Sequence, residues 1–89
     1  MKVLVVGSGG REDAIAREVK RSPLCSELLI APGNPGMAHL GECVSVRADD
    51  LDAVSALVAQ RKIDFVIVGP EIPLVAGLVD RLQKEGVPA

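Results

Sequence analysis

Residues 3–12 read VLVVGSGGRE and set the architecture of the chain. A run of four apolar residues, three of them β-branched, ends at a glycine, which is the pattern of a strand buried on both faces of a parallel sheet. The glycine-rich segment leads into residues 11–21, where Ala14, Ile15 and Val19 form one apolar stripe at helical spacing. The stretch therefore predicts a strand, a tight turn and a helix, the first unit of an α/β fold.

The rest of the chain repeats this alternation. Short apolar or alternating runs predict further strands over residues 28–31, 43–46 and 65–68. Helical spacing predicts helices over residues 50–61 and 73–85. End signals accompany both helices. Asp49 or Asp50 is expected to be the N-cap of the first, and Gly86 is expected to stop the second in a left-handed conformation. The order β-α-β-loop-β-α-β-α predicts an open parallel sheet with helices on both faces, Rossmann-like, with strand order 3-2-1-4.

Composition excludes several classes of protein. The 89 residues, 48% of them hydrophobic, suffice for one core. A net charge of −2 without a run of like charge, and the single aromatic residue Phe65, argue against a nucleic-acid partner. No apolar stretch is long enough to span a membrane, so no membrane partner is expected. Cys25 and Cys43 lack metal-ligand spacing, so we expect two reduced, half-buried thiols in a cytoplasmic protein.

The chain stops at residues 87–89, where a fifth strand would be expected to begin. An open sheet edge at this point would be paired by a continuation of the chain. We therefore expect residues 1–89 to form a single domain at the front of a longer protein.

Ligands of open parallel sheets bind beyond the carboxyl ends of the strands, where three loops of this chain should meet. The first loop contains Gly7, Gly9, Gly10, Arg11 and Glu12. Its glycines allow backbone amides to approach an anion, the helix N-terminus favours negative charge, and the arginine offers a charged donor. The loop predicts a phosphate site; the alternative is a tight turn that needs glycine only for its backbone angles.

This loop departs from the dinucleotide fingerprint G-x-G-x-x-G. Glu12 stands where the third glycine would be, and residues 31–33 read APG where an acid should meet the adenosine ribose. NAD binding is therefore disfavoured.

The second and third loops offer polar groups for the same site. Gly33 and Asn34 lie in a turn fixed by two prolines, although a bare turn is an equal interpretation. The fourth strand is followed by Gly69, Pro70 and Glu71. The Glu71 carboxylate could accept hydrogen bonds from vicinal hydroxyls. Alternatively, it only interacts with the dipole of the last helix. No nucleophile motif is present, so no catalytic residue and no metal ligand are predicted. The residues thus predict a phosphate-and-ribose cradle without catalytic machinery of its own.

The same loops, within residues 5–12, 31–36 and 63–75, resemble the N-terminal domain of the phosphoribosylamine–glycine ligases, also called glycinamide ribonucleotide synthetases. The likeness keeps the family's order and spacing and extends over the whole chain. It implies the pre-ATP-grasp domain of an ATP-grasp ligase of de novo purine biosynthesis. In such enzymes ATP phosphorylates glycine, and the amine of 5-phosphoribosylamine attacks the acyl phosphate.

The resemblance also implies how the work is divided. ATP and Mg²⁺ or Mn²⁺ would be bound by C-terminal ATP-grasp domains absent from this chain, which would hold no cofactor and be inactive alone. The chain would supply the phosphoribosyl side, with Gly9, Gly10 and Arg11 facing the 5-phosphate, Glu71 the ribose hydroxyls and Asn34 helping to close the pocket.

One departure from the family bears on the phosphate site. Where the family usually has histidine after Arg-Glu, this chain has Asp13, which suits the helix dipole but weakens a phosphate site if it faces the pocket. Three alternatives stay open: a Rossmann-type nucleotide- or dinucleotide-binding module, the front domain of another ATP-grasp purine enzyme, and a protein-interaction domain without a small ligand.

Overall fold

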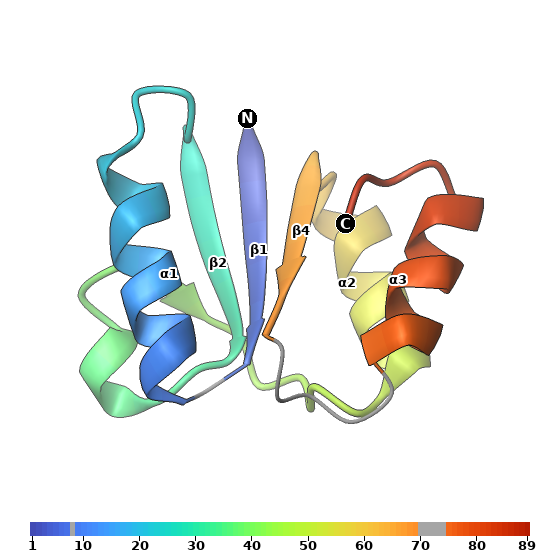
Figure 1. The fold of residues 1–89 in the computed structure, drawn as a ribbon, viewed down its shortest axis with the longest axis horizontal. Coiled ribbons are helices and arrows are strands. Elements are labelled where there is room, and N and C mark those ends of the chain that lie inside the picture. The colour runs from blue at the N-terminus through green and yellow to red at the C-terminus, as the bar shows by residue number, and fades with distance from the viewer. Residues whose placement is uncertain (8, 70–74) are drawn as a thin grey trace.

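The four strands of the sheet are all parallel, as the buried apolar runs predict. The computed structural model describes residues 1–7, 9–69 and 75–89. Its strands are β1 (Lys2–Gly7), β2 (Glu27–Pro32), β3 (Glu42–Cys43) and β4 (Phe65–Val68). Their order is β3-β2-β1-β4, which confirms the predicted topology, with Leu4 paired to Leu29 of β2 and to Val66 of β4 (Figure 1).

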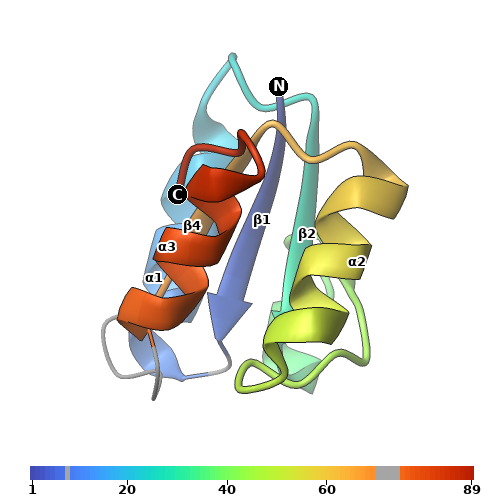
Figure 2. The ribbon, with the colours of Figure 1, turned by 90° about the vertical axis from the view of Figure 1, so that its right-hand side faces the viewer.

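Helices cover both faces of this sheet. They are α1 (Gly10–Arg21), α2 (Leu51–Arg61) and α3 (Val75–Lys84), with a short 3₁₀ helix, η1 (Pro35–Met37). α1 and η1 lie on one side of the strands, and α2 and α3 lie on the other (Figure 1). The view from that second side shows α2 and α3 in front of the sheet and α1 behind it (Figure 2). None of the described helices is both long enough and apolar enough to cross a bilayer.

The alternation of side chains along β1 builds a separate core on each face. Val3 and Val5 join the core under α1 and η1, whereas Leu4 and Val6 join the core under α2 and α3. All four are at most 4% exposed, so β1 is buried on both faces, as its uninterrupted apolar run predicts. The buried members of the core under α2 and α3 are Leu4, Val6, Leu29, Ala31, Val54, Leu57, Val58, Ile63, Val66, Leu78 and Leu82.

The third strand is shorter than predicted. β3 contains two residues, Glu42 and Cys43, instead of residues 43–46. The amide of Val44 still donates to the Ile30 carbonyl (2.8 Å), but the Val46 amide then bonds back to the Val44 carbonyl (2.7 Å), and this turn takes the chain out of the sheet. Cys43 is consequently exposed, which corrects the expectation of two half-buried thiols; Cys25 is partly buried, and both thiols are free.

The predicted end signals of the last two helices are confirmed. Asp50, not Asp49, is the N-cap of α2, and its Oδ1 accepts from the Ala53 amide (3.1 Å). Gly86 follows α3 with φ +84°, and the next amide, that of Val87, donates to the Leu82 carbonyl (2.9 Å). Residues 73 and 74 of the predicted third helix lie outside the described residues.

The segment after α3 returns to the sheet at β4. The amide of Val66 donates to the carbonyl of Pro88 (3.0 Å), and Val87 and Ala89 pack against the core under α2 and α3. Residues 87–89 therefore lie beside β4 and form no strand of their own.

Candidate functional site

The strand ends from which the three predicted loops start lie together at one edge of the sheet. The Gly33 amide donates to the Gly7 carbonyl (3.0 Å), and the Gly69 amide donates to the Val6 carbonyl (3.1 Å). These two bonds join the ends of β1, β2 and β4, at the lower edge in Figure 1. From β1 the chain proceeds to β2 and β3 on one side and then to β4 on the other side of β1. The carboxyl ends of β1 and β4 therefore mark the switch point at which open α/β sheets bind ligands.

α1 begins at this edge with an amino end suited to an anion. Its N-cap is Gly9, which has no side chain to bond the amides of the first turn. Those amides and the helix dipole favour negative charge, as the sequence predicts for a phosphate. Gly10 is the first helical residue; the Arg11 side chain, the predicted charged donor, lies outside what the structure describes.

Glu12 is the buried residue of the site, and its position explains two of the glycines. It is 1% exposed and lies between the ends of β1 and β4. A Cβ atom on Gly7 would lie 2.2 Å from Glu12 Cγ, and one on Gly69 would lie 1.9 Å from Glu12 Oε1. Both glycines are thus needed to make room for a side chain of the protein itself. The sequence signal was the acid in place of a third glycine, but sequence alone did not place its carboxylate.

Asp13, the departure from the family pattern, is engaged by its own helix. Its Oδ2 accepts from Arg17 Nη2 at 3.2 Å, one turn further along α1. Its Oδ1 is buried and accepts no hydrogen bond from the described residues. The Arg17 guanidinium therefore offsets part of the negative charge that Asp13 adds near the helix N-terminus.

The second loop is a fixed turn, as its two prolines and two glycines predict. Asn34 Oδ1 accepts from the Gly36 amide (2.9 Å) and caps η1, which the sequence did not predict as a helix. Gly33 has φ +70°, and a Cβ there would lie 2.8 Å from Cys43 Sγ, so this position requires glycine. The Ala31–Pro32 peptide bond before it is cis. The predicted role of Asn34 in closing a pocket stays a prediction.

The third loop is described only at its first residue. Gly69 is buried against Glu12, whereas Pro70 and Glu71 lie outside the described residues. The predicted contact between Glu71 and ribose hydroxyls therefore stays a prediction.

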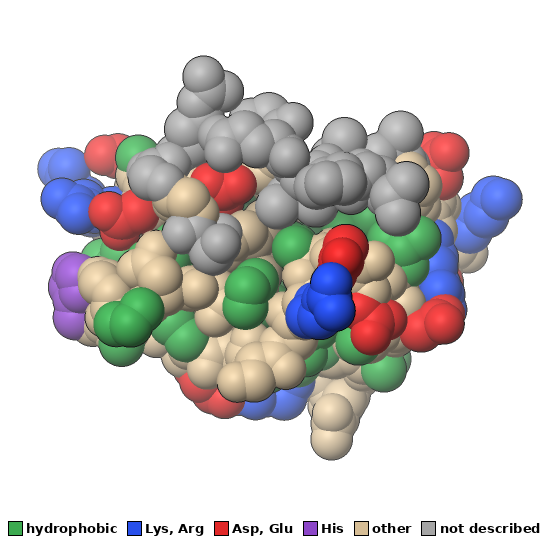
Figure 3. Space-filling model, turned by 90° about the horizontal axis from the view of Figure 1, so that it is seen from below, with side chains coloured by type: hydrophobic (Ala, Val, Ile, Leu, Met, Phe, Trp, Pro, Cys, Tyr) green, Lys and Arg blue, Asp and Glu red, His purple; other side chains and the backbone are tan. Residues whose placement is uncertain are grey.

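Two arginines of the described residues near this edge form ion pairs with carboxylates. Arg47 Nη2 lies 2.9 Å from Asp49 Oδ2, and Arg81 pairs with Asp52. Acidic and basic side chains accordingly lie side by side in the view onto this edge (Figure 3). In residues 1–7, 9–69 and 75–89, no group of three or more His, Cys, Asp or Glu side chains could hold a metal ion.

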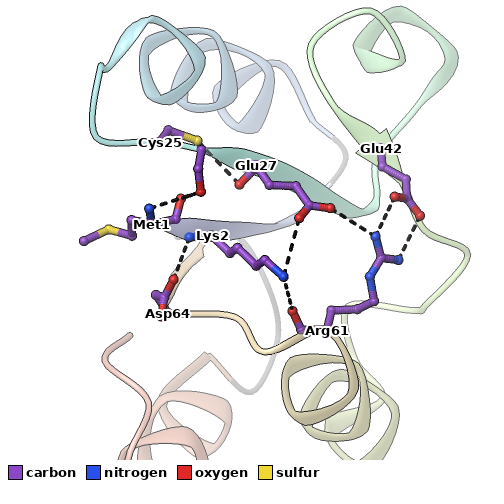
Figure 4. Close-up of polar contacts among 8 residues, drawn as sticks. Met1, Lys2, Cys25, Glu27, Glu42, Arg61 and Asp64 are labelled. Atoms are coloured by element: carbon purple, nitrogen blue, oxygen red, sulfur yellow. Dashed lines mark hydrogen bonds and ion pairs between the residues drawn. The ribbon is translucent and has the colours of Figure 1, made fainter.

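A network of ion pairs lies at the opposite edge, where the strands begin (Figure 4). Arg61, the last residue of α2, forms a bidentate pair with Glu42 (2.9 and 2.7 Å) and also reaches Glu27 (3.3 Å). Lys2 Nζ lies 3.8 Å from Glu27, and the Lys2 amide donates to Asp64 (2.7 Å). The hydrogen bonds and charge of Arg61 lower the pKa of the Glu42 carboxyl, and those of Glu42 raise the pKa of Arg61. This network ties the four strands together away from the candidate site.

Comparison with known proteins identifies the family of the chain. The family model described as "Phosphoribosylglycinamide synthetase, N domain" matches residues 1–89. Proteins named phosphoribosylamine–glycine ligase are similar to 98% of this chain: 52% identical in Agrobacterium fabrum, 49% in Brucella melitensis and 45% in Caldanaerobacter subterraneus. The chain spans about a fifth of the length of these relatives (21%, 20% and 21%). The chain therefore belongs to the family of phosphoribosylglycinamide synthetase N domains.

Proposed function

We propose that this domain supplies the phosphoribosylamine-binding side of a phosphoribosylamine–glycine ligase, which joins glycine to 5-phosphoribosylamine in de novo purine biosynthesis. The observation that carries the proposal is the meeting of three glycine loops at the switch point, beside the amino end of α1, in a member of this family. The longer enzyme would act in the cytoplasm, with ATP-grasp domains C-terminal to this one in the same chain.

The phosphate of the substrate would lie at the amino end of α1. The first-turn amides, beginning after the N-cap Gly9, point along the helix axis toward an anion, and Arg11 would add a charge-assisted bond. A dianionic phosphate held by several N–H donors fixes one end of a flexible sugar and so orients its amine.

The sugar would extend from this phosphate across the ends of β1 and β4. Glu71 would accept from ribose hydroxyls, and the fixed turn at Gly33 and Asn34 would close the side next to β2. The residues of this chain would thus bind and orient the substrate without taking part in bond formation.

The chemistry of activation belongs to the rest of the enzyme. ATP with Mg²⁺ or Mn²⁺ would supply the activation of the glycine carboxylate when bound by the further domains. The described part of this chain offers no cluster of ligands for such an ion, so no step is assigned to it here. The isolated chain is accordingly expected to show no ligase activity.

An amide NMR titration of the ¹⁵N-labelled chain tests the proposal. Glycinamide ribonucleotide, the stable product of the reaction, should shift the amides of residues 7–12, 33, 34, 69 and 71, whereas ATP and NAD should not. Shifts with NAD alone would replace the proposal with a dinucleotide-binding module. That outcome is not expected, because Glu12, at the position of the third fingerprint glycine, fills the space between Gly7 and Gly69.

A further inference from the structure

The Glu12 side chain is buried, and one of its carboxylate oxygens has no hydrogen-bond donor among the described residues. The side chain is 1% exposed, and its Oε2 accepts no hydrogen bond from the described residues. Glu12 is the third residue of α1, where a glutamate commonly bonds back to the N-cap amide. Its side chain instead extends to Gly7 and Gly69, so that Cβ atoms at those positions would lie 2.2 Å from Cγ and 1.9 Å from Oε1.

Such an arrangement is costly unless something pairs with the carboxylate. An ionised carboxylate removed from water without donors loses several kcal/mol of hydration free energy, and native proteins seldom leave such groups unpaired without a functional reason. Two strand ends have glycine where the carboxylate fits. The space is therefore shaped around Glu12, and the group that would satisfy it is missing from the described protein.

The chemistry of a carboxylate limits what that group can be. A carboxylate accepts hydrogen bonds and repels a phosphate placed directly against it, so the phosphate must lie further out along the helix amides. A divalent cation needs several oxygen ligands, and the described residues provide no cluster of them at this point. An O–H or N–H donor remains.

We propose that Glu12 accepts a hydrogen bond from a hydroxyl or amine of the ribosyl part of the ligand, and so distinguishes a phosphorylated ribosyl compound from phosphate alone. This inference rests on the proposed function, because it uses the same cradle. The two ends of one ligand would then bind different groups of the site. The phosphate would bind the amides of α1, and the hydroxyl or amine would donate to Glu12.

The test compares three probes on the wild-type chain and on Glu12→Gln. Glycinamide ribonucleotide offers hydroxyl and N–H donors, ribose 5-phosphate offers hydroxyls without nitrogen, and inorganic phosphate offers neither. Dissociation constants are measured by amide NMR titration. Glu12→Gln removes a negative charge, so inorganic phosphate should bind as well or more tightly. Ribosyl ligands should bind about 10-fold more weakly, because the neutral amide oxygen of glutamine accepts a weaker hydrogen bond than a carboxylate does.

The two ribosyl probes identify the donor. A loss shared by both assigns a hydroxyl to Glu12, and a loss confined to glycinamide ribonucleotide assigns the nitrogen. Asp13→Asn is the matched control, because it removes the same charge from the neighbouring residue and should leave the ratio between ribosyl and phosphate binding unchanged.

A second measurement needs no ligand. Glu12→Gln should melt several degrees above the wild type, because a neutral side chain of the same shape replaces a buried charge without a partner.

Equal ribosyl affinity in wild type and Glu12→Gln would overturn the inference and leave the proposed function standing. A wild-type chain that binds neither ribosyl probe would overturn both. A lower melting temperature for Glu12→Gln would also count against the inference, since it would mean that donors within the protein stabilise the carboxylate.

Discussion

A methyl group at Gly69 would lie 1.9 Å from Glu12 Oε1, far inside the contact distance of the two atoms. Gly69→Ala should therefore push the buried Glu12 side chain out of its position and lower the free energy of unfolding by about 1–3 kcal/mol, as overpacking of a filled site does. Urea unfolding followed by circular dichroism measures this change.

Two variants separate this clash from a general effect of alanine. Among the described residues, the new methyl group of Gly77→Ala, in α3, would meet Leu51 Cδ1 at 3.9 Å, an ordinary contact distance. This variant should stabilise the helix by about 1 kcal/mol. In a Glu12→Ala background the cost of Gly69→Ala should largely disappear, because the two residues are in direct contact. Additive effects of the two substitutions would show that Gly69 is required for another reason.

At the scale of single elements, α2 depends on one capping side chain. The sequence left Asp49 and Asp50 as equal candidates, and the structure assigns the cap to Asp50, whose Oδ1 accepts from the Ala53 amide (3.1 Å). Asp50→Ala should cost about 1 kcal/mol of unfolding free energy, the usual effect of removing an N-cap. Chemical denaturation of the wild type and Asp50→Ala measures this loss.

Asp49→Ala is the matched control for this prediction. Asp49 forms an exposed ion pair with Arg47 (2.9 Å), whose side chain is 82% exposed, so its loss should change the free energy of unfolding by less than about 0.5 kcal/mol. Equal losses from both variants would show that charge at the helix N-terminus, rather than the hydrogen bond to Ala53, stabilises α2.

At the scale of the whole molecule, features with a local cause were predictable and those with a distant cause were not. The two-sided burial of β1 and the stop at Gly86 follow from apolar runs and turn residues that lie close together in the sequence. Strand order follows from the alternation of strands and helices, because the connections between parallel strands are right-handed. The burial of Glu12 against Gly69 and the pairs formed by Arg61 depend on which segments the fold brings together. The site was predictable as a meeting of three loops, because parallel strands place their carboxyl ends at one edge.

The ion pairs of Arg61 make the folding stability of the molecule depend on pH. Arg61 joins α2 to β3 through Glu42 and to β2 through Glu27, and its hydrogen bonds and charge lower the pKa of Glu42 below its ordinary value of 4.5. A carboxyl with a lowered pKa in the folded state contributes stability that is fully present above its unfolded pKa. That contribution is lost as the pH falls through the folded pKa.

The destabilisation caused by Glu42→Gln should therefore be constant above about pH 6, decrease below about pH 4.5 and vanish once Glu42 is protonated in both states. Urea unfolding of wild type and variant across this range measures the difference. It should also shrink in high salt, because the Arg61 and Glu42 side chains are 33% and 53% exposed. Glu18→Gln is the control, since Glu18 pairs with Arg21 on the surface of α1 (3.5 Å, side chains 74% and 75% exposed), and it should change stability little at any pH. A difference between wild type and Glu42→Gln that persisted unchanged into acid would mean that Glu42 stabilises the sheet through packing rather than through its charge.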